Sequence, residues 1–331
     1  MNNPLLEISN LMVSFKSEGT YLNALSGVNL SIYPGQSVAL VGESGCGKSV
    51  TSLSIMRLLK SNAKVEGQIT FDGKGLLNLG VKEMRKIRGH DISMIFQEPM
   101  TALNPVIRIG DQIGEPLLLH EKLTKRQIKT RVLELLKLVG IPRPDEIYKE
   151  YIHQLSGGMR QRVMIAMAMA CKPKLIIADE PTTALDVTVQ AQILDLLRNL
   201  QRENNMALLL ITHDLGVVSE MCERAAVMYA GKIVEEADID TLFENPQHPY
   251  TKGLIASIPK LEGERERLKT IPGNVPSLVN MPKGCRFAPR CEFAMEKCYQ
   301  QEPQHEAISP SQSVSCWLGR GTRNDRSLIT S

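Results

Sequence analysis

Residues 42–49 read Gly-Glu-Ser-Gly-Cys-Gly-Lys-Ser, with glycine at the first and sixth positions and Lys-Ser at the end. This spacing fits the phosphate-loop pattern G-x-x-x-x-G-K-[ST]. Glycines let successive backbone N–H groups approach phosphates, the lysine reaches the β- and γ-oxygens, and the hydroxyl holds Mg²⁺. The candidate phosphate-binding residues are Gly42, Glu43, Ser44, Gly45, Cys46, Gly47, Lys48, Ser49 and Val50. The sequence therefore predicts a Mg²⁺–nucleotide site, with Lys48 and Ser49 at its centre.

Two adjacent carboxylates, Asp179 and Glu180, follow the apolar residues 175–178. At the tip of a strand, Asp179 is placed to hold Mg²⁺, directly or through water. Glu180 is then the residue left to polarise an attacking water. The alternative, two solvated acids that merely end a strand, is disfavoured by the phosphate loop upstream.

These groups require a layered scaffold, and short apolar runs alternate with longer amphipathic ones over about the first 245 residues. That alternation is typical of an α/β domain. Antiparallel strands are expected at residues 5–14, 29–33 and 68–71, and buried parallel strands at residues 38–41, 92–96, 174–178 and 207–211. Residues 125–139 carry apolar side chains at the spacing of one helical face, which predicts a helical insertion.

Residues 155–162 read Leu-Ser-Gly-Gly-Met-Arg-Gln-Arg. Ser156 can cap the following helix, while Gly157 and Gly158 leave its N-terminal amides open to an anion. Alone, the segment could equally be a well-capped helix after a turn. It resembles the signature sequence of the ATP-binding cassette (ABC) family, with Met159 where Gln is usual. The resemblance implies that this helix faces the γ-phosphate of ATP bound to an opposite subunit.

Further motifs of that family occur in order along the chain. Gln97 resembles the glutamine that touches Mg²⁺ and the attacking water, and residues 184–186 resemble the loop between two cassettes. His213 resembles the histidine that contacts the γ-phosphate. A lone histidine is more often structural, but His213 follows a buried strand, where ligands collect in such sheets. For adenine stacking, both Phe15 and Tyr21 are candidates, and Tyr21 is preferred.

Residues 98–105 and 245–254 resemble the ATPase subunits of oligopeptide and dipeptide importers and their nickel-transporting relatives. This resemblance covers about residues 5–318. It implies an α/β ABC-type P-loop ATPase domain at residues 1–245, comprising a mixed sheet with helices, an antiparallel β subdomain and a helical subdomain at about 98–172. A small Cys-rich C-terminal domain is expected at 246–318, because prolines punctuate the chain after residue 243. A flexible tail is expected at 319–331, which is polar, rich in Arg and Ser, and outside the resemblance.

Seven cysteines divide into two groups. Cys46, Cys171 and Cys222 are interpreted as small apolar fillers, although the position of Cys46 beside phosphate-binding amides could lower its thiol pKa.

Four thiols gather in the proline-rich segment: Cys285, Cys291, Cys298 and Cys316. Metal ligation is the better account in a cytosolic protein, where disulfides are disfavoured. The spacing lacks the C-x₂-C pairs common at structural zinc, whereas some members of the importer subgroup hold an iron–sulfur cluster in such a tail. A structural [4Fe–4S] cluster is therefore preferred over zinc or unligated thiols.

The formal net charge of +3 without a Lys/Arg block does not indicate a nucleic-acid binder. No apolar run approaches the roughly 18 to 20 residues that span a bilayer, and the N-terminus lacks a signal pattern. The resemblance implies ATP hydrolysis coupled to import, at the cytoplasmic face of the membrane. The expected partners are two transmembrane permeases, a second, non-identical cassette and, indirectly, an extracytoplasmic binding protein. Alternatives are an importer for nickel or another small solute, and a soluble cassette ATPase acting on nucleic acid or ribosomes.

Overall fold

The computed structural model describes residues 3–17, 19–183, 185–258 and 270–318. Ala184 and the predicted tail at 319–331 lie outside these residues. The chain forms two compact units. The first unit comprises Met1–Leu5, Ile32–Ser37 and Asp72–Ile211, and the second comprises Leu6–Ser31, Val38–Phe71 and Thr212–Ser331.

Three buried parallel strands form the centre of the first unit. They are β6 (Ile92–Ile95), β7 (Leu175–Asp179) and β8 (Ala207–Thr212). Their register pairs Ile92 with Leu175 and Leu175 with Ala207, so the strands lie in the order β8-β7-β6. The prediction of buried parallel strands in these three places is confirmed. Because the strands are parallel, their carboxyl ends lie at one edge.

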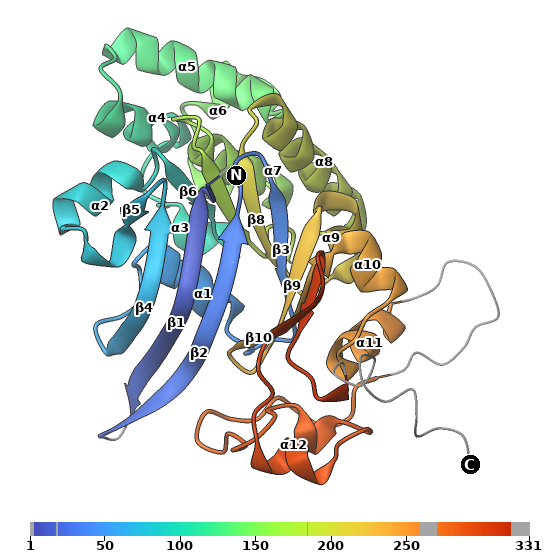
Figure 1. Cartoon of the computed structure of the whole chain (residues 1–331). Helices are drawn as coiled ribbons and strands as arrows, with labels where there is room; N and C mark the ends of the chain where they lie inside the picture. The colour runs from blue at the N-terminus through green and yellow to red at the C-terminus, as the bar shows by residue number, and fades with distance from the viewer. Residues whose placement is uncertain (1–2, 18, 184, 259–269, 319–331) are drawn as a thin grey trace. The chain divides into compact units, whose positions relative to one another are not determined.

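Helices make up most of the rest of the first unit (Figure 1). They are α2 (Val81–Ile87), α3 (Pro99–Ala102), α4 (Ile109–His120), α5 (Lys125–Leu138), α6 (Pro144–Ile147), α7 (Gly157–Ala168) and α8 (Val187–Glu203), with the short β5 (Lys74–Gly75) before α2. Helix α5 confirms the helix predicted at 125–139. The Thr124 hydroxyl accepts a hydrogen bond from the Gln127 N–H at its start, and the predicted apolar face is buried.

The second unit contains two groups of strands. An antiparallel group has the order β2-β1-β4, formed by β1 (Leu6–Ser17), β2 (Thr20–Ile32) and β4 (Ala63–Phe71). The antiparallel strands predicted near the N-terminus are therefore confirmed, although all three are longer than expected. The other group comprises β3 (Ser37–Val41), β9 (Arg224–Tyr229), β10 (Lys232–Asp238), β11 (Glu306–Ser309) and β12 (Gln312–Val314).

Strand β3, which was predicted, pairs in parallel with β9. Strands β9 and β10, which were not predicted, form an antiparallel pair. The short helices of this unit are α1 (Lys48–Ile55), α9 (Leu215–Met221), α10 (Ile239–Glu244), α11 (Pro249–Ala256) and α12 (Glu296–Gln300). No described helix after residue 245 exceeds eight residues, as the prolines predicted.

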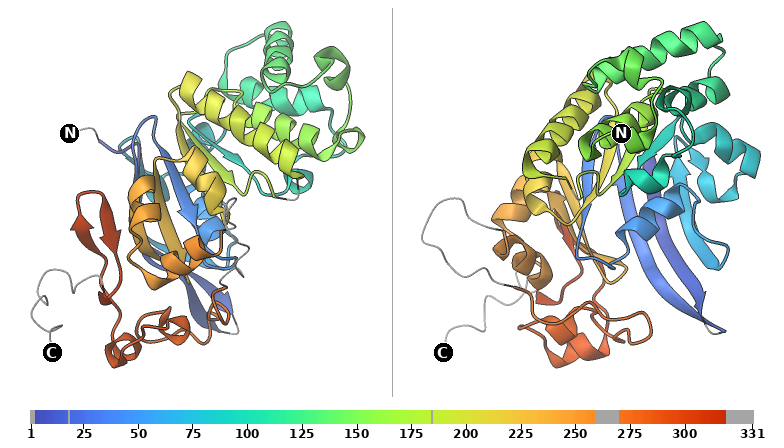
Figure 2. Two further views of the ribbon diagram at one scale, coloured as in Figure 1. Left: turned by 90° about the vertical axis from the view of Figure 1, so that its right-hand side faces the viewer. Right: turned by 180° about the vertical axis from the view of Figure 1, so that it is seen from behind.

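The proline-rich segment is fastened to strand β10. Strand β12 pairs with β10, placing Val314 opposite Glu235, and β11 extends the pairing as a hairpin, shown in red in Figure 2. The fully buried Glu235 carboxylate accepts hydrogen bonds from the backbone N–H groups of Gln247 (2.7 Å) and His248 (2.8 Å) and from Gln312 Nε2 (2.8 Å). Three donors offset the cost of burying this charge. A separate C-terminal domain is thus not confirmed, and the boundary at 245 stays a prediction.

Within the described residues, every helix is too short or too polar to cross a membrane.

Candidate nucleotide site

The phosphate loop joins β3 to α1, as the strand–loop–helix pattern predicted. The Lys48 side chain folds back inside the loop, where its Nζ donates hydrogen bonds to the carbonyl oxygens of Gly42 (2.7 Å) and Glu43 (3.2 Å). Lys48 is only 5% exposed, so its ammonium group stays beside the loop backbone. The loop therefore combines a fixed positive charge with the N-terminus of α1, as an anion site requires.

The phosphate loop also packs closely on strand β9. A Cβ at Gly42 would lie 2.2 Å from the Met228 carbonyl oxygen, so only glycine fits. Further along the loop, Cys46 accepts a hydrogen bond at its carbonyl oxygen from the Gly231 N–H (2.7 Å). Backbone contacts from β9 and from the turn after it thus fix the path of the loop.

Cys46 is fully buried, and burial raises the pKa of its thiol although Lys48 acts in the opposite direction. The expectation of a lowered pKa is therefore wrong. Burial also raises the thiol pKa of Cys171 to about 11 and that of Cys222 to about 12, as expected of apolar fillers.

Glu43 differs from the other loop residues because its polar groups contact the C-terminal segment. Its N–H donates to the Tyr250 hydroxyl (2.8 Å), and its carboxylate pairs with Arg290 (2.6 Å). Sequence reasoning proposed Glu43 as a phosphate ligand and missed both partners. Tyr250 lies in the segment that resembled peptide importers, which was the signal available.

Of the two carboxylates at the end of β7, Glu180 contacts Gln97. Asp179 ends the strand and is 4% exposed. The next residue, Glu180, has a left-handed backbone (φ +47°), and its Oε2 accepts hydrogen bonds from Gln97 Nε2 and Thr183 Oγ1, each at 2.9 Å. A non-glycine residue in this conformation stores strain, which is typical of functional sites. The first unit thus brings together Gln97 and Glu180, both predicted to act on the same water.

The signature segment begins helix α7 as predicted. The Ser156 hydroxyl accepts a hydrogen bond from the Met159 N–H (3.4 Å), and Ser156 and Gly157 are exposed. A Cβ at Gly158 would lie 2.7 Å from Val189 of α8, so glycine permits the close approach of these helices. The first residues of α7 are therefore exposed, while Gly158 also allows α7 to pack closely on α8.

His213 and Tyr21 belong to the second unit, as does the phosphate loop. His213 is exposed and follows β8, and Asp214 caps α9 by accepting a hydrogen bond from the Gly216 N–H (2.8 Å). Tyr21 on β2 is 52% exposed, whereas Phe15 on β1 is partly buried. Both the γ-phosphate contact and the adenine stacking stay predictions.

The four C-terminal cysteines, Cys285, Cys291, Cys298 and Cys316, line one cavity of about 10 Å³. A single water needs about this volume, so a cluster does not fit the cavity as it stands. Across the described residues, no three His, Cys, Asp or Glu side chains are arranged to hold a metal ion. Burial raises the pKa of the Cys285 thiol to about 11. The predicted cluster is therefore not confirmed, and no disulfide joins these thiols.

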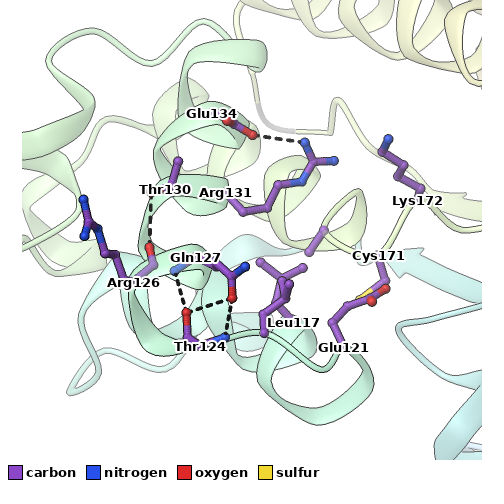
Figure 3. A pocket seen from close by; sticks show the side chains of 12 residues that line it. Leu117, Glu121, Thr124, Arg126, Gln127, Thr130, Arg131, Glu134, Cys171 and Lys172 are labelled. Carbon is purple, nitrogen blue, oxygen red and sulfur yellow. Dashed lines mark hydrogen bonds and ion pairs between the residues drawn. The ribbon is translucent and has the colours of Figure 1, made fainter.

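A larger cavity of about 590 Å³ lies in the helical part of the first unit (Figure 3). Its polar side chains pair with one another: Arg131 with Glu134 (3.3 Å), and Thr124 with Gln127 (2.8 Å). No residue predicted for the nucleotide site lines it. The cavity is thus distinct from the phosphate loop and from the carboxylates after β7.

Comparison with known families gives two matches. Residues 25–183 match the family described as ABC transporter, and residues 234–298 match the oligopeptide/dipeptide transporter C-terminal region. The first match contains the phosphate loop, Gln97 and Glu180, and the second contains Tyr250 and Arg290.

Two similar curated proteins come from Bacillus subtilis. The dipeptide transport ATP-binding protein DppD is 54% identical over 316 residues, covering 95% of this chain and 94% of that protein. The oligopeptide transport ATP-binding protein AppD is 52% identical over 316 residues, covering 95% of this chain and 96% of that protein. Among solved structures, the post-hydrolysis dimer of the ATP-binding cassette MJ0796 with ADP and Pi has a TM-score of 0.64 and 31% identity, covering 71% of this chain and 98% of that one.

Proposed function

This chain belongs to the ABC transporter family, and on that premise we propose that it is the ATP-hydrolysing subunit of a membrane importer for oligopeptides or dipeptides. The observation that carries the proposal is the match to peptide-transport ATP-binding proteins, which continues past the cassette through residues 234–298. A likeness limited to residues 25–183 would support only the ATPase.

The chain is an ABC-type ATPase. We assign phosphate binding to Lys48, Ser49 and the amides of the loop, supported by the inward position of the Lys48 ammonium. The Ser49 hydroxyl and the Asp179 carboxylate are oxygen ligands of the kind that would hold Mg²⁺, which would supply charge neutralisation at the phosphates. Most of the rate enhancement then comes from positioning and electrostatics.

Glu180 is proposed to polarise the attacking water, with Gln97 and His213 orienting the γ-phosphate end. The hydrogen bond from Gln97 Nε2 to Glu180 Oε2 supports a joint role for these two residues, because it fixes the direction of the carboxylate.

A dimer of cassettes is proposed because Ser156, Gly157 and Gly158 begin a helix whose first residues are exposed. In the proposed dimer these residues face the nucleotide of the other cassette, through the N-terminal end of the α7 dipole. The partners proposed are a second, non-identical cassette and two permeases at the cytoplasmic face of the membrane, with a binding protein acting from the other side.

Mass spectrometry of the proteins that co-purify with this chain from gently solubilised native membranes tests the proposal. Two multi-span permeases and a second cassette are the expected result. A nickel-type permease pair would correct the solute and keep the importer. Ribosomal or nucleic-acid partners, with the chain absent from membranes, would overturn the transport function and leave the ATPase.

We further propose that the four C-terminal cysteines hold a [4Fe–4S] cluster in the metal-loaded protein. Supporting this, thiols up to 31 positions apart, from Cys285 to Cys316, line the same cavity. Anaerobic purification with iron and sulfide assays is the test. Four irons and four sulfides per chain are expected, and zinc at one equivalent without iron would overturn the proposal.

A further inference from the structure

The contact between Glu43 and the C-terminal segment joins the two family regions matched by this chain. The Glu43 carboxylate oxygens pair separately with Arg290 Nη1 (2.6 Å) and Nη2 (3.0 Å). Such a two-point ion pair fixes the carboxylate in one plane as well as in position. Because Glu43 is the second residue of the phosphate loop, the pair fixes the loop where it leaves β3.

Arg290 is itself held in place. Its Nε donates to the Pro272 carbonyl oxygen (2.8 Å), its Nη2 to that of Ile271 (3.3 Å), and its Nη1 to the Tyr229 hydroxyl (3.3 Å). The Arg290 side chain is 5% exposed, and its hydrogen bond to Glu43 raises the guanidinium pKa further. An arginine with this many partners is a rigid anchor for Glu43.

Tyr250 supplies the second contact. Its hydroxyl accepts the Glu43 N–H at 2.8 Å, and its ring is fully buried against Tyr229 (centroids 4.7 Å apart) and Phe287 (5.4 Å). Tyr229 is the last residue of β9, the strand whose Met228 carbonyl limits position 42 to glycine. The aromatic side chains therefore tie the C-terminal segment to the strand on which the loop lies.

Arg290 and Tyr250 contact the loop at Glu43, whose N–H is taken by the Tyr250 hydroxyl and so does not point to a phosphate. Their effect on ATP therefore passes through the position of the loop. We propose that Arg290 and Tyr250 are positioning residues of the ATPase: through Glu43 they hold the phosphate loop in the conformation that binds the nucleotide phosphates. This inference rests on the proposed function, because it assigns a role within the same site. It also gives a role to the two contacts that Glu43 makes with the C-terminal segment.

The test is Mg·ATP affinity of the full chain, measured by titration calorimetry. Arg290→Ala should weaken affinity on the order of tenfold, since one buried charged hydrogen-bond pair is lost. Arg290→Lys should recover part of that loss, because lysine keeps the charge and loses the fork. Tyr250→Phe keeps the ring and loses the acceptor, so a few-fold weakening is expected.

A double-mutant cycle separates positioning from general support. In a Glu43→Ala background, Arg290→Ala should weaken affinity no further, because its effect passes through Glu43. The matched control is Glu302→Gln, which removes a carboxylate paired with Lys232 (2.6 Å) and Arg286 (3.7 Å) but not with Glu43, and should leave affinity unchanged.

Fully additive losses in that cycle would overturn the inference, as would an Arg290→Ala chain that keeps its affinity while its Tm falls. If Arg290→Ala does not fold, the Mg·ATP affinities of Arg290→Lys and Tyr250→Phe still test the inference, and wild-type affinity in both would overturn it. Failure of the ATPase assignment is distinguishable: the wild-type chain would then bind no Mg·ATP, or Lys48→Ala would bind it normally.

Discussion

At the residue scale, Glu180 is oriented by two donors on the same carboxylate oxygen. Gln97 Nε2 and Thr183 Oγ1 both lie 2.9 Å from its Oε2. Gln97 lies two residues after β6, whereas Thr183 lies three residues after Glu180. A carboxylate fixed by a distant and a local donor keeps one orientation when water approaches, as a general base requires.

Glu180→Gln should bind Mg·ATP normally and lose turnover by a factor on the order of 10² or more, because the amide cannot accept a proton. The measurement is single-turnover ATP hydrolysis with a parallel binding titration. Thr183→Val is the matched control, since it removes one donor and keeps the carboxylate, and a much smaller loss is expected. Wild-type turnover in Glu180→Gln would remove Glu180 from the mechanism.

Burial of His248 makes the stability of the fold depend on pH under acidic conditions. Complete burial lowers its pKa to about 3 from the usual 6.5, and its Nδ1 accepts a hydrogen bond from the Tyr250 N–H (3.1 Å). The unfolded chain binds a proton below about pH 6.5 and the folded chain does not, so stability falls as the pH drops from 6.5 towards 3. The contribution is at most about 1.4 kcal/mol per pH unit.

Denaturant titrations of the wild type between pH 7 and 5 should show this loss, and His248→Asn should show a flatter dependence because asparagine does not titrate. Equal slopes for the two chains would contradict the assignment to His248.

At the scale of elements, the phosphate loop depends on one close backbone approach to β9. Gly42→Ala should displace the loop, because a Cβ there meets the Met228 carbonyl oxygen at 2.2 Å, and Mg·ATP binding should be lost. Gly73→Ala is the matched control. Its φ is +74° and nothing lies within 4 Å of the added Cβ, so only a conformational cost of about 1 kcal/mol is expected.

Circular dichroism and Mg·ATP titration of both glycine variants provide the readout. If Gly42→Ala binds ATP as Gly73→Ala does, then the close approach to β9 does not control the loop.

The elements predicted best were those with a local signal. Continuous apolar runs identified β3, β6, β7 and β8, and one apolar face identified α5. Strand β2 extends back to Thr20, because pairing with β1 overrides its polar residues. The hairpin β11–β12 was missed for a similar reason: its stability comes from pairing with β10, which no local pattern reveals.

At the scale of the whole molecule, contacts across residue 245 predict that the cassette does not fold without the C-terminal segment. A chain ending there lacks Gln247, His248 and Gln312, the three donors to the buried Glu235 carboxylate. An unpaired buried charge costs several kcal/mol, and the edge of β10 is exposed as well. We expect the chain truncated at residue 245 to show no cooperative thermal transition.

A chain ending at residue 318 keeps all of these contacts and serves as the control. Differential scanning calorimetry of the two chains decides the point. A cooperative transition of the shorter chain at the wild-type Tm would instead establish the domain boundary predicted from the sequence.

As with the strands and helices, the site residues found from the sequence were those in a local motif, and the one missed depends on a distant contact. Lys48, Asp179 and Glu180 were identified because each belongs to a short motif with its own chemistry. Arg290 was missed because its function depends on a residue at the other end of the chain, and a lone arginine in a proline-rich segment has no pattern.

The distance along the chain between Glu43 and Arg290 has a consequence for protein synthesis. The two residues are 247 positions apart, so at the usual rate of translation Glu43 is made about 12 to 50 s before its partner. A nascent chain therefore contains the whole phosphate loop well before it contains the arginine that anchors it. Under the proposed anchoring, ATP binding of full strength becomes available only after Arg290 has been made.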